Sequence, residues 1–291
     1  MEDVIQKAKV LIEALPYIQA FRGATVVIKF GGSAMEDESI MRSVLADVTF
    51  MECVGMRPVM VHGGGKAISR SMNEQGIAAR FVKGLRVTCE KTMEVVERVM
   101  KGDVNPRIVS MLRGMGAGAE TVDGKQVFTV RRKTERDEKT GETIDWGLVG
   151  EPGEVHVEPI ERVLNESAIP VIMPLGLGLD GKTHNINADT AACAVAGAMQ
   201  ARKLVFLSDV PGLLRYADDP DSLISTLKVS QVEELSRAGV IGGGMLPKVK
   251  SGVEALQAGV RKVHMIDGRM PHSLLLEILT DKGVGTEILS D

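Results

Sequence analysis

The stretch Val26-Val-Ile-Lys-Phe-Gly-Gly-Ser33 decides the fold prediction for this chain. It starts as a β-branched run, passes through Lys29 to two glycines and a serine, and precedes an acidic segment compatible with a helix. A strand, a tight glycine turn and a helix start allow backbone N–H groups to point at an anion, with a lysine beside them as a point charge. The stretch therefore predicts an anion-binding turn at the end of a strand.

The same pattern returns about thirty residues later in Pro58–Lys66, PVMVHGGGK. An apolar strand again ends in glycines, and a helical segment again follows. If the two strands are neighbours in one sheet, their glycine turns face one crevice. Such a crevice suits a phosphoryl group and a small anionic acceptor.

Beyond these turns, strands and helices alternate along the chain. We expect further strands at 169–175, 204–207 and 262–266, and helices at 39–53, 66–75, 189–199, 229–238 and 271–279. We also expect a hairpin at 81–89, helix over 90–111 with an interruption near Pro106, and a charged surface hairpin at 127–151. Strands flanked by helices in this rhythm are typical of an α/β fold with a mostly parallel sheet.

The composition excludes several classes of protein. The chain has 291 residues, a net charge of −4, 44% hydrophobic and 3% aromatic residues. This balance predicts one large domain or two lobes, and it gives no reason to expect nucleic acid or a membrane as a partner. Three widely spaced cysteines fit a reducing compartment, and the charged N-terminus lacks a long apolar core. We therefore expect a cytoplasmic protein.

Residues 1–22 form a predicted amphipathic helix. Apolar residues from Ile5 to Ile18 recur three or four apart, with charges opposite, and Pro16 is expected to kink the helix. Two interpretations stay open. The helix either packs on its own domain or is an arm that reaches a neighbouring subunit.

Two lysines, one arginine and one aspartate are candidates for chemistry. Lys29 and Lys248 lie in glycine-rich segments, and two such lysines favour phosphate clamping over solvated turn positions. Arg86 is either a bidentate partner for a substrate carboxylate or a surface arginine on a hairpin. Asp189 either complements the dipole of the helix that it begins or holds the two lysines in position.

A competing motif lies at Gly176–Thr183, GLGLDGKT, which fits the P-loop string and follows a predicted strand. A P-loop requires a helix that begins at its Lys-Thr pair. Here His184–Asn187 intervenes, and Asn187 is the predicted N-cap. The alternatives are thus a P-loop NTPase that uses Lys182 and a turn at the tip of a hairpin.

The chain resembles the amino acid kinase family, and within it the branch that phosphorylates N-acetyl-L-glutamate. The matching segments, in the family's order, are VVIKFGGSAM, VMVHGGGKAI, GLRVT, GLVGEPGEV, HNINADTAA, LSDVPGLL, GGGMLPKV and MIDGRMPHSLLLEILTDKGVGT. The resemblance implies a three-layer αβα open sandwich with a mostly parallel central sheet. It also implies an N-terminal arm at 1–24, an amino-acid lobe at 25–183 and an ATP lobe at 184–291.

The resemblance further implies transfer of the γ-phosphoryl group of ATP to the γ-carboxylate of N-acetyl-L-glutamate, a step of arginine biosynthesis, with Mg²⁺ held by the nucleotide phosphates. It assigns catalysis to Lys29, Lys248 and Asp189, and acceptor binding to Gly32, Gly64, Gly65, Arg86 and Asn185. It assigns ATP binding to Asp209, Val210, Gly212, Leu213, Leu214, Val240, Ile241, Gly242 and Gly243.

The N-terminal arm and Leu274–Thr286 resemble those of the family's arginine-inhibited hexamers. The resemblance implies a hexamer built as a trimer of dimers and interlaced by the arm. It also implies an L-arginine site formed by Tyr17, Lys203, His264, Glu277 and Gly283. The segment from Pro174 to Asp189 carries more glycine and lysine than the family pattern, which bears on the nucleotide pocket.

The reaction agrees with the lack of an evident general base. A carboxylate with a reference pKa of about 4.3 is already ionised at neutral pH, so catalysis reduces to bringing two anions together and neutralising charge. Two rivals stay open besides the P-loop enzyme. One is a sister kinase acting on an acetylated or carrier-linked aminoadipate in lysine biosynthesis, and the other is a silent regulator on the same fold.

Overall fold

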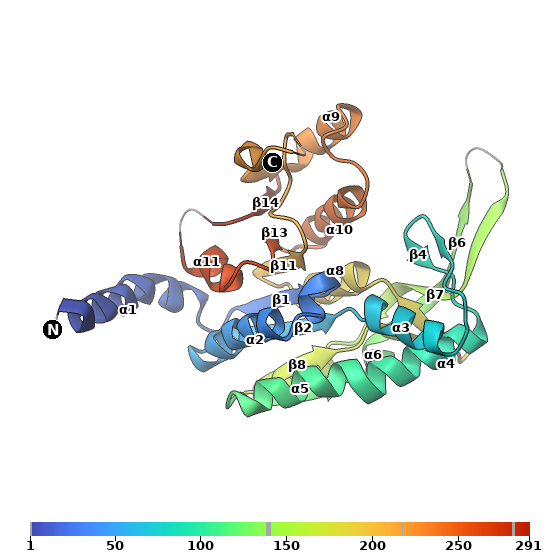
Figure 1. Ribbon diagram of the computed structural model, residues 1–291, viewed down its shortest axis with the longest axis horizontal. Helices are drawn as coiled ribbons and strands as arrows, with labels where there is room; N and C mark the ends of the chain where they lie inside the picture. The colour runs from blue at the N-terminus through green and yellow to red at the C-terminus, as the bar shows by residue number, and fades with distance from the viewer. Residues whose placement is uncertain (1, 138–140, 217, 281–282) are drawn as a thin grey trace.

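A large central sheet organises the computed structural model, which describes residues 2–137, 141–216, 218–280 and 283–291 (Figure 1). In the described residues the sheet has eight strands in the order β12-β14-β13-β11-β1-β2-β8-β5. The strands are β1 (Thr25–Phe30), β2 (Arg57–His62), β5 (Ala119–Val122), β8 (Ile169–Ile172), β11 (Lys203–Ser208), β12 (Thr226–Lys228), β13 (Lys262–Asp267) and β14 (Thr286–Leu289). The neighbouring strands run parallel except for β13 with β14.

The predicted three-layer sandwich is confirmed, because alternate residues of the central strands feed two cores. In β1, Val26, Ile28 and Phe30 pack into one core, whereas Val27 packs into the other. The first core takes side chains from α2 (Glu38–Cys53), α3 (Gly65–Glu74), α4 (Glu90–Val99), α5 (Asn105–Gly114) and α11 (Ser273–Leu279). The second takes them from α7 (Glu158–Asn165), α8 (Ala188–Ala198) and α10 (Met245–Gln257).

A small closed barrel lies beside the main sheet and is built from β6 (Phe128–Arg136), β7 (Thr143–Val155), β9 (Leu175–Gly178) and β10 (Thr183–Ile186). The predicted charged hairpin is β6 and β7, although the last residues of its charge run lie outside the described residues. A Cβ on Gly176 would lie 2.3 Å from Val130 Cγ1, so the barrel interior has no room for a side chain there. Of the two glycines that suggested a phosphate loop, Gly176 thus packs inside the barrel, and Gly181, with φ of +75°, lies in the turn between β9 and β10.

Shorter elements connect these layers. They are η1 (Gly32–Met35), β3 (Phe81–Val82), β4 (Leu85–Arg86), η2 (Met100–Val104), α6 (Gly124–Val127), η3 (Pro220–Ser222), η4 (Val229–Gln231) and α9 (Val232–Arg237). The predicted interruption in the 90–111 helix is η2, a π-helical turn that precedes Pro106. The hairpin predicted at 81–89 is β3 and β4.

The N-terminal helix α1 (Glu2–Phe21) projects from the body of the molecule, and the chain continues as helix past Pro16 (Figure 1). Its end is anchored, because Phe21 is buried. Among the side chains of this helix that the structure describes, five large apolar ones are exposed, with Leu11 and Ile12 at 66% and 68%. Exposed apolar side chains gathered in one place mark an interaction surface. This exposure favours the interpretation as an arm.

The predicted division into an arm, an amino-acid lobe and an ATP lobe stays a prediction, since the central sheet takes strands from both lobe segments. In the part of the chain that the structure describes, none of the helices combines the length and the apolar character needed to cross a membrane.

Candidate active site

The turns that follow β1, β2 and β11 meet at one edge of the sheet. β1 pairs in parallel with β2 on one side and with β11 on the other. Parallel strands place their carboxyl ends at the same edge, and open α/β sheets bind ligands where the strand order reverses. The two predicted glycine turns therefore lie side by side at the expected position of a ligand site.

Close backbone packing joins the two turns. Gly63 N–H donates to Phe30 O over 2.7 Å, and a Cβ on Gly63 would lie 3.5 Å from Gly31 Cα. At Gly32 the backbone φ is +75°, and a Cβ would meet Asp209 Oδ1 at 2.7 Å. Both the left-handed backbone and the nearby carboxylate thus require glycine at position 32.

The first glycine turn binds an anionic group of the protein itself. Ser33 N–H donates to Asp209 Oδ1 and Oδ2 over 3.0 and 3.1 Å. Asp209 follows β11, so this contact ties the turn after β1 to the neighbouring strand. A backbone N–H at the start of η1 therefore already serves as an anion-binding donor, as the sequence predicts for this turn.

The three predicted catalytic side chains form one cluster. Lys29 comes from β1, Asp189 from the first turn of α8 and Lys248 from the first turns of α10. Lys29 Nζ lies 3.0 Å from Asp189 Oδ1, and Lys248 Nζ lies 2.9 Å from Asp189 Oδ2. Asn187 caps α8 by accepting from Asp189 N–H and so fixes the start of that helix. One carboxylate therefore aligns two ammonium groups.

Burial and charge act in opposite directions in this cluster. Burial lowers the pKa of Lys29, and Asp189 counteracts that effect. Burial opposes ionisation of Asp189 as well, but the charges of Lys29 and Lys248 outweigh it and hold the pKa of Asp189 below its usual range. The pair of lysines with one aspartate carries a net positive charge. A cluster of this kind can stabilise a phosphoryl group as charge develops on its oxygens.

A cavity of about 420 Å³ lies against the two glycine turns and contains most of the predicted acceptor residues. Gly32, Gly64, Gly65 and Arg86 line it. The Lys29 ammonium is close by, since a Cβ on Gly31 would lie 2.9 Å from Lys29 Nζ. The first glycine turn thus lies between the cavity and Lys29.

Arg86 is held firmly at the wall of this cavity. Its Nη2 donates to Gly65 O over 2.9 Å and to Ser69 Oγ over 2.7 Å. Its guanidinium also lies 4.7 Å from the centre of the Phe81 ring. Arg86 is 7% exposed, so it is not a solvated surface arginine. The alternative of a hairpin surface residue is wrong.

The sequence did not predict a second arginine in this cavity. The family resemblance, by contrast, assigned Asn185 to acceptor binding. Arg107 lines the cavity and donates to Met35 O over 2.8 Å. It follows Pro106 at the start of α5, a helix-start signal that could have marked it. Asn185 lies on β10, paired with Val149 of the barrel, and is not among the residues that line this cavity. Its role in acceptor binding stays a prediction.

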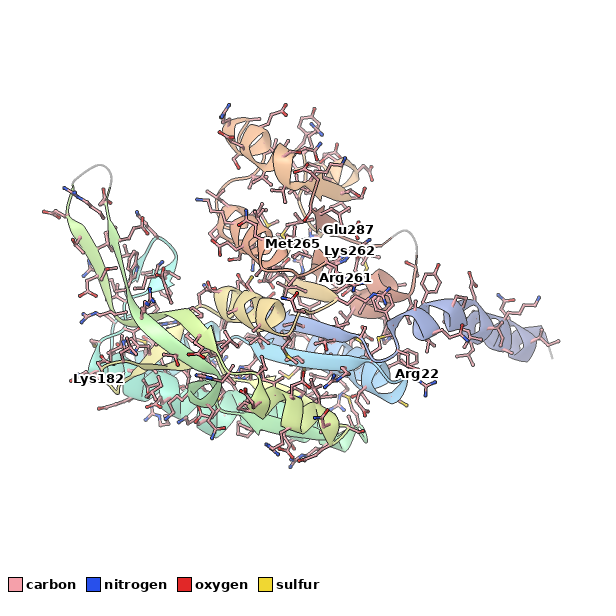
Figure 2. All side chains as sticks on the ribbon, turned by 180° about the vertical axis from the view of Figure 1, so that it is seen from behind. Arg22, Lys182, Arg261, Lys262, Met265 and Glu287 are labelled. Atoms are coloured by element: carbon pink, nitrogen blue, oxygen red, sulfur yellow. The ribbon has the colours of Figure 1, made fainter. Side chains whose placement is uncertain are left out.

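A separate cavity of about 660 Å³ brings together the five residues predicted to bind arginine. Lys203 begins β11, whereas Lys29 pairs with Phe206 near the other end of that strand. The lining of the cavity includes Tyr17, Lys203, His264, Glu277 and Gly283. Figure 2 shows Arg261, Lys262 and Glu287, which also line it, where the C-terminal strands approach α1. The cavity therefore lies at the junction of the arm with the C-terminal part of the sheet.

Comparison with known proteins agrees with this geometry. The sequence profile of the amino acid kinase family matches residues 24–267, which include the strands and turns of the site. The chain belongs to the amino acid kinase family. A curated relative named acetylglutamate kinase, from Caldanaerobacter subterraneus subsp. tengcongensis, is 49% identical over 286 residues, which cover 98% of this chain and 94% of that protein.

Among solved structures, an N-acetylglutamate synthase from Neisseria gonorrhoeae has a fold similar to that of this amino acid kinase. The synthase complexed with coenzyme A and N-acetyl-glutamate superposes with a TM-score of 0.82 at 28% identity, covering 97% of this chain. The same synthase complexed with coenzyme A and L-arginine gives a TM-score of 0.79 at 27% identity, covering 95% of this chain. This chain spans 63% and 64% of the length of those two chains.

The segments predicted to bind ATP flank the lysine cluster, but their contacts stay a prediction. They are Asp209–Leu214 after β11 and Val240–Gly243 before α10. The side chains of Leu213 and Ile241 are buried in the second core and are therefore not available to a nucleotide. Val210 is 38% exposed, and Leu213 N–H donates to Thr286 Oγ1. Gly212 has no room for a Cβ beside the same threonine hydroxyl.

The P-loop alternative is wrong for this amino acid kinase. Gly178 and Thr183 lie on the antiparallel strands β9 and β10, so the motif forms a hairpin and no helix begins at its lysine. Lys182 Nζ instead pairs with Glu90 Oε1 over 2.6 Å in an exposed ion pair. Figure 2 shows Lys182 at the lower left, well apart from Lys262 and Glu287 near the middle of the view.

Proposed function

We propose that this chain transfers the γ-phosphoryl group of ATP to the γ-carboxylate of N-acetyl-L-glutamate, in arginine biosynthesis. The observation that carries the proposal is the Lys29–Asp189–Lys248 cluster beside an arginine-walled cavity with a glycine floor. The relative that is 49% identical over nearly the whole chain bears the name acetylglutamate kinase, which supports the same acceptor. The products would be ADP and an acyl phosphate.

Different residues act on the two anions, which are the acceptor carboxylate and the phosphoryl group. Arg86 offers a fixed guanidinium to a carboxylate of the acceptor, and arginine stays charged even when buried. The amides of the glycine turns face the reacting groups, while Lys29 and Lys248 neutralise the phosphoryl oxygens in flight. The acceptor carboxylate is ionised at neutral pH, so no residue has to remove a proton. The rate enhancement then comes from positioning and electrostatic stabilisation.

Mg²⁺ fits this scheme as an ion held by the nucleotide. Both oxygens of Asp189 already face ammonium groups, and both oxygens of Asp209 accept from Ser33 N–H. Among the described residues, no group of three or more His, Cys, Asp or Glu side chains is arranged to hold a metal ion. The metal would neutralise charge on the β- and γ-phosphates, and the protein would supply lysines and amides around it.

The acceptor is tested by measuring ADP production with N-acetyl-L-glutamate and with a panel that includes acetylated aminoadipate and free glutamate. We expect N-acetyl-L-glutamate to have the highest kcat/KM. One methylene changes binding by about 1–3 kcal/mol, so we expect about a 10- to 200-fold preference over the longer acceptor. A higher kcat/KM with the aminoadipate compound would assign the chain to the sister kinases of lysine biosynthesis.

We also propose that L-arginine inhibits this enzyme by binding the 660 Å³ cavity, and that α1 joins dimers into a hexamer. The cavity carries a buried polar cluster, in which His264 Nδ1 lies 2.5 Å from Glu277 Oε1 and Val284 N–H donates to Glu277 Oε2. Burial lowers the pKa of Lys203 and of His264. The related synthase has been crystallised with L-arginine, which supports the choice of ligand.

Removing residues 1–22 should convert the hexamer to dimers and abolish inhibition by arginine, while the substrates are still turned over. The reason is that the arm supplies both the exposed apolar face and Tyr17. Size-exclusion chromatography with light scattering and inhibition curves check this. The full-length double variant Leu11→Ser with Ile12→Ser should also give dimers, whereas Glu13→Ser on the same helix should not. An unchanged oligomer after deletion contradicts the proposed role of the arm.

A further inference from the structure

The imidazole of His62 lies where β2 ends and the second glycine turn begins. His62 and Asn105 have no exposed surface. His62 Nδ1 lies 2.7 Å from Gly63 O, and Asn105 Nδ2 lies 3.0 Å from His62 Nε2. The proposed transfer reaction assigns no role to either side chain. Burying two polar side chains costs free energy unless they are fully hydrogen-bonded, so we expect this buried pair to fulfil a structural role.

The hydrogen bonds around Asn105 determine which nitrogen of His62 carries the proton. Asn105 Nδ2 also donates to Val171 O over 3.0 Å, and Asn105 Oδ1 accepts from Thr121 Oγ1 over 2.5 Å. The amide orientation is thereby fixed, and an amide nitrogen only donates. His62 Nε2 must accept, so Nδ1 carries the proton and donates to Gly63 O. Burial lowers the pKa of His62 to about 4, which keeps the ring neutral near neutral pH.

Fixing Gly63 O also fixes the direction of the next N–H group. The peptide unit is planar and trans, so the Gly63 carbonyl and the Gly64 N–H point in opposite directions. The carbonyl is turned toward the buried imidazole, and the N–H is therefore turned away from it. Gly64 and Gly65 line the acceptor cavity, and α3 begins at Gly65, where the first N–H groups have no partner within the helix.

The π-helical turn η2 supports the same peptide from the α4–α5 side. A Cβ on Gly64 would lie 2.8 Å from Met100 Sδ, so the first residue of η2 packs directly against the glycine turn. Asn105 follows the last residue of η2 and reaches His62. Single π turns inside helices occur frequently at functional sites. Here the packing contact comes from Met100 at the start of the π turn, and the hydrogen-bond donor is Asn105, directly after its end.

We propose that His62, held by Asn105 and Thr121, is a positioning residue that orients the Gly63–Gly64 peptide so that Gly64 N–H faces the reacting anions. The inference rests on the proposed phosphoryl transfer, because that reaction supplies the anions. His62 itself touches neither substrate. Its contribution is to prevent rotation of a glycine peptide that has no side chain to restrain it.

Two isosteric substitutions at one position test the inference. The amide nitrogen of asparagine can take the place of imidazole Nδ1, whereas that of glutamine takes the place of Nε2. His62→Asn should therefore keep the donor to Gly63 O, and His62→Gln should lose it. We expect His62→Gln to lower kcat about 10- to 100-fold with the KM for ATP within about twofold, and His62→Asn to stay within about threefold of wild type.

Hydrogen exchange followed by mass spectrometry gives a readout that does not depend on activity. Peptides covering Gly63–Gly65 should exchange faster in His62→Gln than in wild type, and at the wild-type rate in His62→Asn. Thr121→Val, at an exposed position that should tolerate the change, should loosen the same turn and lower kcat about threefold to tenfold. Thr121→Val therefore also tests the inference if His62→Gln fails to fold.

Equal kcat and equal exchange in His62→Gln and His62→Asn would overturn the inference, as would unchanged exchange at the turn in Thr121→Val. If the proposed function itself is wrong, the experiments give a different result. In that case wild type produces no ADP with N-acetyl-L-glutamate, while the exchange difference between the two His62 variants is still present.

Discussion

Lys29→Ala and Lys248→Ala should each lower kcat by about 100- to 1,000-fold, the range seen when one electrostatic donor is removed from a transition state. Both ammonium groups lie within 3.0 Å of Asp189, and the loss of either leaves the other lysine's charge balanced by this carboxylate, so the cluster no longer carries a net positive charge. The KM for the acceptor should change much less, because Arg86 and the glycine turns remain. Coupled ADP production and binding of a fluorescent ATP analogue measure the two effects separately.

Lys182→Ala is the matched control for these variants. It removes an ammonium group of the same kind from an exposed ion pair with Glu90, outside the lysine cluster. Its kcat should stay within about twofold of wild type, because exposed ion pairs contribute little. If Lys29→Ala and Lys248→Ala were as active as Lys182→Ala, the lysine cluster would not be the catalytic centre.

Asp189→Asn should produce an enzyme whose activity rises as the pH falls. Burial lowers the pKa of Lys29, and the Asp189 charge is the main effect that raises it again. Without that charge the pKa of Lys29 falls further, so a larger fraction of this lysine is neutral at pH 8. Lowering the pH restores the ammonium form. We expect kcat/KM for ATP to be at least about tenfold below wild type at pH 8, with the gap narrowing toward pH 6.

The measurement is kcat/KM for ATP between pH 6 and pH 9 for wild type, Asp189→Asn and the control Asp180→Asn, because this ratio reports the ionisation of the free enzyme. Asp180 is a carboxylate at the β9–β10 turn, outside the lysine cluster. A profile for Asp189→Asn that runs parallel to wild type at all pH values would show that Asp189 does not set the charge of Lys29. It would then act only as a geometric link between the two lysines.

Much of the site could be predicted because its signals are local. The glycines after β1 and β2, the lysine within β1 and the Asn187 cap of α8 each occupy a short segment with a fixed backbone geometry. Parallel pairing then brings these segments together without further information. The lysine cluster follows from the same logic, since α8 and α10 both begin at this edge of the sheet.

The parts that escaped prediction depend on contacts between distant segments. Ser33 and Asp209 are 176 residues apart, and His62 and Asn105 are 43 residues apart. Nothing in the local sequence indicates that these pairs meet. The GLGLDGKT string shows the converse problem. Its glycines satisfy the spacing of a phosphate loop, but Gly176 leaves space inside a barrel and Gly181 takes a left-handed turn conformation.

Asp189 and Lys248 are 59 residues apart in sequence, and this separation affects the order of events when the enzyme folds. A nascent or refolding chain can form α8 early, because the backbone hydrogen bonds within a helix are local, yet the lysine cluster is incomplete until α10 docks. Regained turnover would thus be a late signal of assembly, behind the return of helical circular dichroism, because long-range contacts form more slowly than local ones.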